Sequence, residues 1–247
     1  MYDLTVIIPT FNEEANIRNI VMAVDAVFHE NSLHGQILVV DDNSSDATIS
    51  IVQELKRQKE NVDILVREKD HGLSQSVADG FTHAASDVFI VIDADFSHPP
   101  VLIPRMYDEI RKGNDIVIGS RYMEGGEIKN WPLKRRFISI GATLLGRMLF
   151  PDITDPVSGF FAVRKQVVQD APLKPRGYKI LLEVLEVPLQ VDALNFLFLD
   201  LLLPFLQLGL FLQDLMLESL FPLIDQAIPL LSLLDFLLQF PDCPSSL

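Results

Sequence analysis

The chain has 247 residues, a formal net charge of −14 and a single cysteine, Cys243. That length is enough to bury one large α/β core or two small ones. One cysteine excludes a disulfide framework, and the acidic balance argues against a nucleic-acid partner, because non-specific binding of phosphates needs a cationic face.

The first half of the chain alternates between strand-like and helix-like patterns. Short apolar runs rich in β-branched residues, typical of buried parallel strands, occur at 4–9, 36–41, 62–66, 88–93 and 115–120. Helical spacing predicts helices at 13–28, 73–85 and 100–112, and another, capped by Ser45 and Asp46, that runs to Leu55. Such alternation indicates an α/β fold with a mostly parallel sheet and helices on both faces.

The pattern changes after the fifth predicted strand. Residues 121–132 have the composition of a loop, and 134–150 form a basic-headed amphipathic helix. Residues 155–165 are typical of a turn that leads into a short strand, and 177–185 of a helix.

The remaining residues differ in composition. Residues 187–247 are acidic and rich in Leu and Phe, and they contain no Lys or Arg. Three interpretations stay open: one or two membrane segments, since 194–212 reaches the roughly 20 residues that a span needs; an amphipathic helical appendage; or an altered reading frame. We therefore expect one domain at 1–186, with halves at 1–120 and 121–186, followed by this tail.

Polar residues follow several of the predicted strands at their carboxyl ends. They are Asn12 and Glu13 after the first strand, Asp41 and Asp42 after the second, Asp93 and Asp95 after the fourth, and Arg121 after the fifth. Ligands of open α/β sheets bind beyond the carboxyl ends of the strands. Convergence of four strand ends on one edge therefore predicts an active site there.

Two of these strand ends are rich in carboxylates. Asp93 and Asp95, two positions apart, can hold Mg²⁺ or Mn²⁺, and the ion would neutralise the negative charge of a departing diphosphate. The alternative is that the two acids lie at a helix N-terminus, where they interact favourably with the helix dipole. Asp41 and Asp42 can accept hydrogen bonds from a ribose or a base; the alternative is a simple turn.

Basic and hydroxyl side chains suggest a phosphate site. Arg121, Arg135 and Ser139 offer hydrogen-bond donors suited to phosphate oxygens. The alternative is that the basic residues only form the solvent-exposed start of a helix. His71 and His98 are interpreted as loop residues or neighbours of the site, because no His/Cys cluster has zinc spacing. Neither a Gly-rich phosphate loop nor a nucleophile elbow is present, which counts against dinucleotide oxidoreductases, P-loop NTPases and hydrolases.

Eight stretches in order and spacing resemble the family 2 glycosyltransferases with a GT-A fold, and most of all the dolichol-phosphate mannosyltransferases. They cover about residues 4–186 and read VIIPTFNEEANI, VVDDNSSDAT, HGLSQSVADGF, VIDADFSHPP, DIVIGSRYMEGG, the RR of LKRRFIS, DPVSGFFAVRK and GYKILLE. The family usually continues with an Arg-containing loop and a GESK-like run, which this chain lacks.

The resemblance implies a role for particular residues. The nucleoside of the donor would be held by Pro9, Phe11, Glu13, Val40 and Asp42. The metal and diphosphate site would be Asp93, Ala94 and Asp95, with Ser97 as a further metal contact. The lipid phosphate would be received by Arg121, Arg135 and Ser139, and Lys179 would help with donor phosphates; the catalytic residues would be Asp93, Asp95 and Arg121.

The implied activity is the transfer of a hexose, with inversion, to dolichyl or another polyprenyl phosphate, with Mn²⁺ or Mg²⁺ as cofactor. Mannose from GDP-mannose is the first expectation for the hexose, and glucose from UDP-glucose is the second. If the acceptor were instead a sugar hydroxyl, a base would be needed, and Asp155 is the candidate. The alternatives are another family 2 glycan transferase and an inactive, membrane-tethered relative without C-terminal phosphate ligands. We expect a membrane-associated protein, because the basic cluster of Lys134, Arg135 and Arg136 above an apolar helix suits an anionic lipid headgroup. The first residues, MYDLTVIIPT, show no secretory signal, so the cytoplasmic face is expected.

Overall fold

The computed structural model describes residues 2–120, 153–169, 173 and 180–189. Its strands are β1 (Leu4–Thr10), β2 (Gly35–Asp41), β3 (Val62–Val66), β4 (Val88–Val91), β5 (Ile116–Ile118) and β6 (Phe161–Arg164). Its helices are α1 (Ile17–Glu30), α2 (Thr48–Gln58), α3 (Leu73–His83), the 3₁₀ helix η1 (Pro100–Leu102), α4 (Ile103–Arg111), α6 (Lys165–Val168) and α7 (Ile180–Leu189).

The strands form one sheet in the order β3-β2-β1-β4-β6-β5. Strands β1 to β4 are parallel to one another, whereas β6 runs antiparallel to both β4 and β5. The chain adds β2 and β3 on one side of β1 and then crosses to add β4 on the other side. The predicted mostly parallel sheet is confirmed, and its order reverses between β1 and β4.

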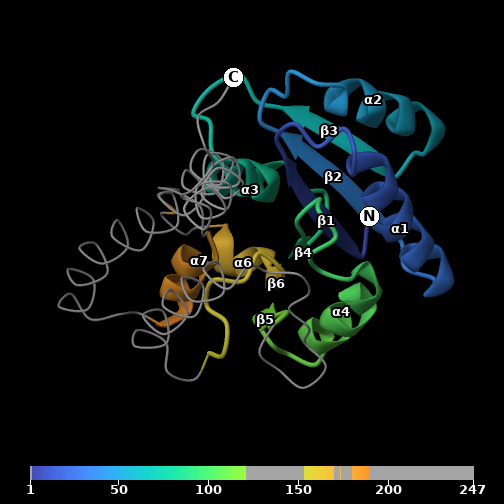
Figure 1. Cartoon of the computed structure of the whole chain (residues 1–247). Coiled ribbons are helices and arrows are strands. Elements are labelled where there is room, and N and C mark those ends of the chain that lie inside the picture. Colours follow the sequence, from blue (N-terminus) through green and yellow to red (C-terminus); the bar gives the residue numbers. More distant parts are fainter. Residues whose placement is uncertain (1, 121–152, 170–172, 174–179, 190–247) are drawn as a thin grey trace, which may run out of the picture.

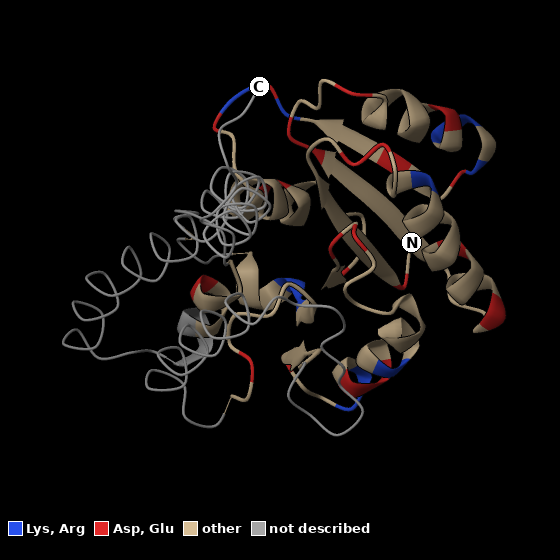
Figure 2. Ribbon diagram, viewed as in Figure 1, with Lys and Arg blue, Asp and Glu red and all other residues tan. Residues whose placement is uncertain are grey.

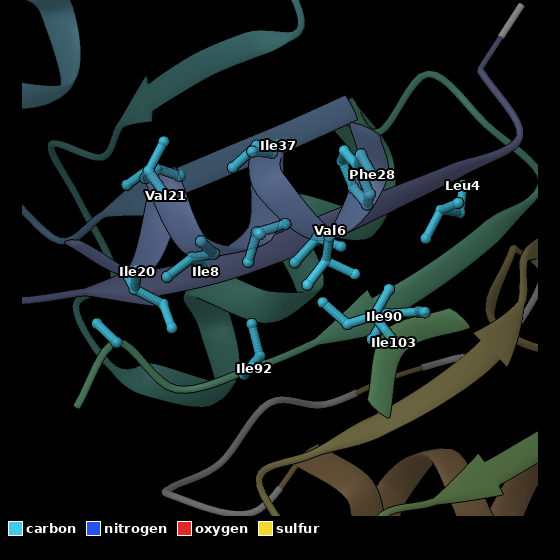
Figure 3. Close-up of a cluster of buried hydrophobic side chains, with 14 of the residues drawn as sticks. Leu4, Val6, Ile8, Ile20, Val21, Phe28, Ile37, Ile90, Ile92 and Ile103 are labelled. Atoms are coloured by element: carbon cyan, nitrogen blue, oxygen red, sulfur yellow. The ribbon is translucent and has the colours of Figure 1, made fainter. Parts of the chain in front are cut away.

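Helices cover both faces of the sheet (Figure 1), as the sequence predicts. Along β1, Val6 and Ile8 pack under α1 and α4, whereas Ile7 points to the opposite face under α3 and α7, which is the two-residue period of a strand. Figure 3 shows the first of these clusters, in which Ile20 and Val21 of α1 lie against Val6 and Ile8. Burial on both faces explains why the strands have continuous apolar runs.

Some element ends differ from the predictions. Helix α1 begins at Ile17, four residues later than expected; the amides of Glu13 and Glu14 donate to the side chains of Thr48, at the start of α2, and Asp46, just before it. The helix expected at 100–112 starts as the 3₁₀ helix η1. Strand β4 ends at Val91, although the Ile92 amide still donates to the Ile7 carbonyl at 3.1 Å.

The short strand expected after residue 155 is present as β6, and the helix expected at 177–185 is present as α7. Because β6 lies between β4 and β5, a strand from the second predicted half completes the sheet of the first half. The helix expected at 134–150 and residues 190–247 of the expected tail lie outside the described residues, whereas α7 continues to Leu189, past the predicted boundary at 186. The domain limits stay a prediction. Among the helices described, none has the length and apolar character to cross a bilayer.

A buried carboxylate ties α1 to the loop before β3. Asp25 accepts hydrogen bonds from Lys59 Nζ at 2.6 Å and from Asn61 Nδ2 at 2.9 Å, and its side chain is 6% exposed. Burial by itself raises the pKa of Asp25, but the hydrogen bonds from Lys59 and Asn61 and the Lys59 charge together hold this pKa below its ordinary value.

This interaction predicts a pH-dependent contribution to stability. A carboxyl whose folded pKa is depressed stabilises the fold above its unfolded pKa of about 3.9, and that stability is lost as pH falls through the folded value. We therefore expect Lys59→Met to lower the free energy of unfolding at pH 7 by about 2 kcal/mol, and the loss to shrink towards pH 3. Urea unfolding at both pH values measures it.

The control is Lys56→Met, which breaks an ion pair with Asp63 whose side chains are 51% and 45% exposed. Exposed pairs contribute about 0–1 kcal/mol, so this variant should be nearly neutral. Equal losses for the two variants at pH 7, or a Lys59→Met loss that does not change with pH, would contradict the assignment.

Candidate active site

Three neighbouring strands bring their carboxyl ends to the same edge of the sheet. Thr10 of β1 is in register with Asp41 of β2, and the amide of Asp42 donates to the Thr10 carbonyl at 2.9 Å. On the other side of β1, Ile7 is in register with Val91 of β4. The chain therefore leaves β1 at Phe11, β2 at Asp42 and β4 shortly before Asp93 along one rim, where acidic residues lie on the loops (Figure 2).

The two consecutive acids at the end of β2 have different environments. Asp41 is fully buried, and its carboxylate accepts hydrogen bonds from Thr10 Oγ1 at 2.8 Å and from the Ser44 amide and hydroxyl at 2.8 and 2.7 Å. Asp41 thus holds the turn after β2. Asp42 lies at the surface side of the same turn, with a side chain that is 12% exposed.

Donors from the loop between β3 and α3 fix the carboxylate of Asp42. Its Oδ1 accepts from Arg67 Nη1 at 2.6 Å and lies 2.9 Å from His71 Nδ1, and its Oδ2 accepts from the Gly72 amide at 2.8 Å. The sequence analysis did not identify Arg67, although a single arginine at the end of a buried strand was a visible signal. His71 is a loop residue beside Asp42, as interpreted.

The loops after β1 and β2 are joined by hydrogen bonds. The Asn12 amide donates to Ser44 Oγ at 2.8 Å, Asn12 Oδ1 accepts from the Ser45 amide at 2.9 Å, and the Glu13 amide donates to Thr48 Oγ1 at 2.8 Å. Asn12 has a φ of +56°, a left-handed conformation that Asn tolerates better than most residues. These contacts fix the backbone next to Phe11.

The residues predicted to hold the nucleoside occupy different depths. Phe11 is 62% exposed at the rim, and Glu13 is half-buried with Oε2 accepting from Asn16 Nδ2 at 2.9 Å. Pro9 is buried at the end of β1, and Val40 is fully buried in the core beneath α3. Direct contact of these residues with a nucleotide stays a prediction.

A cleft opens at the point where the sheet order reverses. Its wall contains Pro9 from β1 and Asp93, which follows β4. Leu73 and Val77 of α3 line the α3 side, and Ser158, Gly159, Val91, Phe161, Ile180 and Leu181 complete the wall. Ligands of doubly wound sheets bind at such a reversal.

The residues predicted to bind metal lie on the loop after β4. The side chain of Asp93 is 31% exposed and lies 3.9 Å from His98 Nε2. Asp95 is exposed, and its Oδ1 accepts from the amide of Ser97, which is also exposed. Ala94 between the two acids is buried.

Oxygen ligands of this kind suit Mg²⁺ or Mn²⁺. Gly159 leaves room for the Asp93 carboxylate, because a methyl group at Gly159 would lie closer to Asp93 Oδ2 than van der Waals contact allows. Within the described part of the chain, no group of three or more His, Cys, Asp or Glu side chains is placed to hold an ion.

The remaining candidates divide into two groups. His98 is buried in the loop after β4 and stacks on Phe160, with ring centroids 5.3 Å apart. Asp155 is fully buried. The predicted phosphate-binding residues Arg121, Arg135, Ser139 and Lys179 lie outside the described residues, so their roles stay predictions.

Sequence comparison connects this rim to a family. The sequence profile of Glycosyl transferase family 2 matches residues 5–171. The chain is 48% identical over 188 residues to a dolichol-phosphate mannosyltransferase of Pyrococcus furiosus, covering 74% of this chain and 52% of that protein. It is 34% identical to the Saccharomyces cerevisiae dolichol-phosphate mannosyltransferase, covering 77% and 73%. The chain thus spans about half the length of the archaeal relative.

Structure comparison supports the fold. A crystal structure of glucosyl-3-phosphoglycerate synthase from Mycobacterium tuberculosis, in complex with Mn²⁺, UDP-glucose and phosphoglyceric acid, superposes with a TM-score of 0.60 at 18% identity. The match covers 78% of this chain and 67% of that one. At this identity the likeness is one of fold.

The contact between Gly159 and Asp93 yields a prediction. Gly159→Ala should displace the Asp93 carboxylate and weaken Mn²⁺ binding about tenfold, a loss typical of disturbed support around a metal ligand. Electron paramagnetic resonance of free Mn²⁺, titrated in the presence of GDP, measures the affinity.

Gly35→Ala is the matched control, because its methyl group would crowd Phe28 in the core, far along the chain from Asp93. Both variants should lower the melting temperature, but only Gly159→Ala should change Mn²⁺ affinity. Unchanged Mn²⁺ affinity in Gly159→Ala would contradict a metal site at Asp93.

Proposed function

Because the chain belongs to glycosyl transferase family 2, we propose that it transfers a hexose from a sugar nucleotide to dolichyl or another polyprenyl phosphate, with inversion and with a bound Mn²⁺ or Mg²⁺. The observation that carries this proposal is the meeting of Phe11, Asp42 and the Asp93 loop on one rim, beside the cleft at the β1–β4 reversal. Mannose is the proposed sugar, in line with the relatives' names, and GDP-mannose is the donor that the family resemblance implies.

The nucleoside would bind between the ends of β1 and β2. The exposed ring of Phe11 offers a stacking face, and Asp42 offers a carboxylate to ribose hydroxyls. A carboxylate has about four acceptor positions, and the protein donors around Asp42 occupy three of them. One position on Oδ2 is therefore left for a ligand, while Pro9, Glu13 and Val40 would shape the floor and edge.

The diphosphate end of the donor would lie at the loop after β4. Asp93, Asp95 and Ser97 would hold the divalent ion, with Ala94 packed between them. The ion would supply Lewis-acid stabilisation of the leaving nucleoside diphosphate. Asp95, which is exposed, would face the bound donor, whereas Asp93 sits deeper at the cleft wall.

The acceptor would not need a strong general base. A phosphate monoester is already anionic near neutral pH, so orientation of its oxygen is the main requirement. Arg121, Arg135 and Ser139 would bind this phosphate and Lys179 the donor phosphates, as the family resemblance implies. Asp155 is fully buried, which favours a phosphate acceptor over a sugar hydroxyl that would need this residue as a base.

The proposal is tested with the full chain by transfer of radiolabelled mannose from GDP-mannose to dolichyl phosphate in detergent, with Mn²⁺ and with EDTA. We expect metal-dependent label in the lipid phase, and a loss of about 100-fold or more in Asp95→Ala, because Lewis-acid stabilisation contributes several kcal/mol and each 1.36 kcal/mol is a factor of ten.

Asp108→Ala, which removes an exposed acid from α4, is the control and should keep wild-type activity. UDP-glucose in place of GDP-mannose tests the alternative donor, and label from UDP-glucose alone would reassign the sugar. Binding of GDP with Mn²⁺ but no transfer from either donor would point to the inactive relative. Transfer that persists in EDTA would contradict the metal site.

A further inference from the structure

The most heavily bonded side chain in the described part of the molecule is Arg67, which follows β3. Its guanidinium donates from Nη1 to Asp42 at 2.6 Å and to Ser76 Oγ at 3.2 Å, and from Nε to Asp79 at 2.7 Å. Its Nη2 donates to the carbonyls of Lys69 and Asp70 at 3.1 and 2.5 Å. All five N–H donors of an arginine are therefore engaged.

These contacts occur away from water. The side chain of Arg67 is 3% exposed, whereas those of Asp42 and Asp79 are 12% and 35% exposed. A buried cation depends on its carboxylate partners to offset the cost of desolvation. The guanidinium is also planar and rigid, so a contact that fixes Nε also fixes the orientation of Nη1.

The two carboxylates play different parts in this arrangement. Asp42 lies at the rim where the nucleoside would bind, and it meets Nη1. Asp79 lies in the second turn of α3, and it meets Nε. The side chains of Asp79 and Asp42 are therefore linked through the guanidinium that they share.

We propose that Arg67 is a positioning residue for nucleotide binding: anchored by Asp79, it holds Asp42 and the loop of Lys69 and Asp70 in the orientation that receives the nucleoside. This inference rests on the proposed function, since it assumes that a nucleoside diphosphate binds at Asp42. Arg67 itself contacts no ligand; it acts by preorganising Asp42, which lowers the ordering cost of binding.

The inference is tested by a double-mutant cycle on the full chain, with the dissociation constant for GDP in the presence of Mn²⁺ measured by calorimetry. Asp42→Ala should weaken GDP about tenfold. Asp79→Ala, on α3, should weaken GDP about threefold to tenfold, and Asp42→Ala should then cost clearly less in the Asp79→Ala background, because residues in one network are non-additive.

Asp63→Ala is the matched control, since it removes an equally charged ion-pair partner from β3 without touching Arg67. It should leave GDP affinity unchanged. Arg67→Lys supplies a second variant: a lysine cannot bridge both carboxylates as a planar fork does, so GDP should bind at least about tenfold more weakly while the fold is retained by circular dichroism.

A purely structural role would give a different result. In that case Asp79→Ala would lower the melting temperature yet leave the GDP constant unchanged, or the effects of the two Asp variants on that constant would multiply independently. Either result, with GDP bound normally by the wild type, would overturn the positioning role alone. A wild-type chain that binds no nucleoside diphosphate would overturn both this inference and the proposed function.

Discussion

Strand β1 has parallel partners on both sides, β2 and β4, and is buried on both faces. Because these neighbours run in the same direction as β1, the carboxyl ends of all three strands lie at the same edge of the sheet. The chain crosses from one side of β1 to the other before β4, so no connecting helix covers the space between β1 and β4 at that edge. The cleft bounded by Pro9 and Asp93 follows from this topology. The helices and the other strands hold this edge in place.

Several acidic side chains lie close together at this edge, so the folded protein must stabilise them. Asp41 accepts hydrogen bonds from Thr10 and Ser44 inside the turn, and Asp42 is paired with Arg67. Asp95 instead remains exposed. Asp41 is thus built into the turn after β2, whereas Asp42 keeps one acceptor position on Oδ2 and Asp95 is open to a ligand from outside.

The sequence predicted elements where local pattern decides structure, and it was less accurate where distant residues decide it. The apolar runs of β1 and β2 and the periodicity of α1 indicated a doubly wound sheet, because burial on both faces leaves a local signature. The predicted start of α1 was wrong, and it lies where the amides of Glu13 and Glu14 bind side chains more than 30 residues away in sequence, which no local pattern shows. Asp41 and Asp42 look equivalent in sequence, and Arg67 was missed because its partners are 25 and 12 positions away.

The central claim is that a nucleoside diphosphate and a divalent ion share the edge between β2, β1 and β4. The most direct test is paramagnetic broadening of amide signals in the ¹⁵N-labelled full chain when Mn²⁺ is added with GDP. The account predicts that broadening centres on Asp93 to Ser97, extends to Phe11 and Asp42, and requires GDP to appear at low Mn²⁺ concentration. Broadening that centres on the outer helices, or that is the same without GDP, would contradict it.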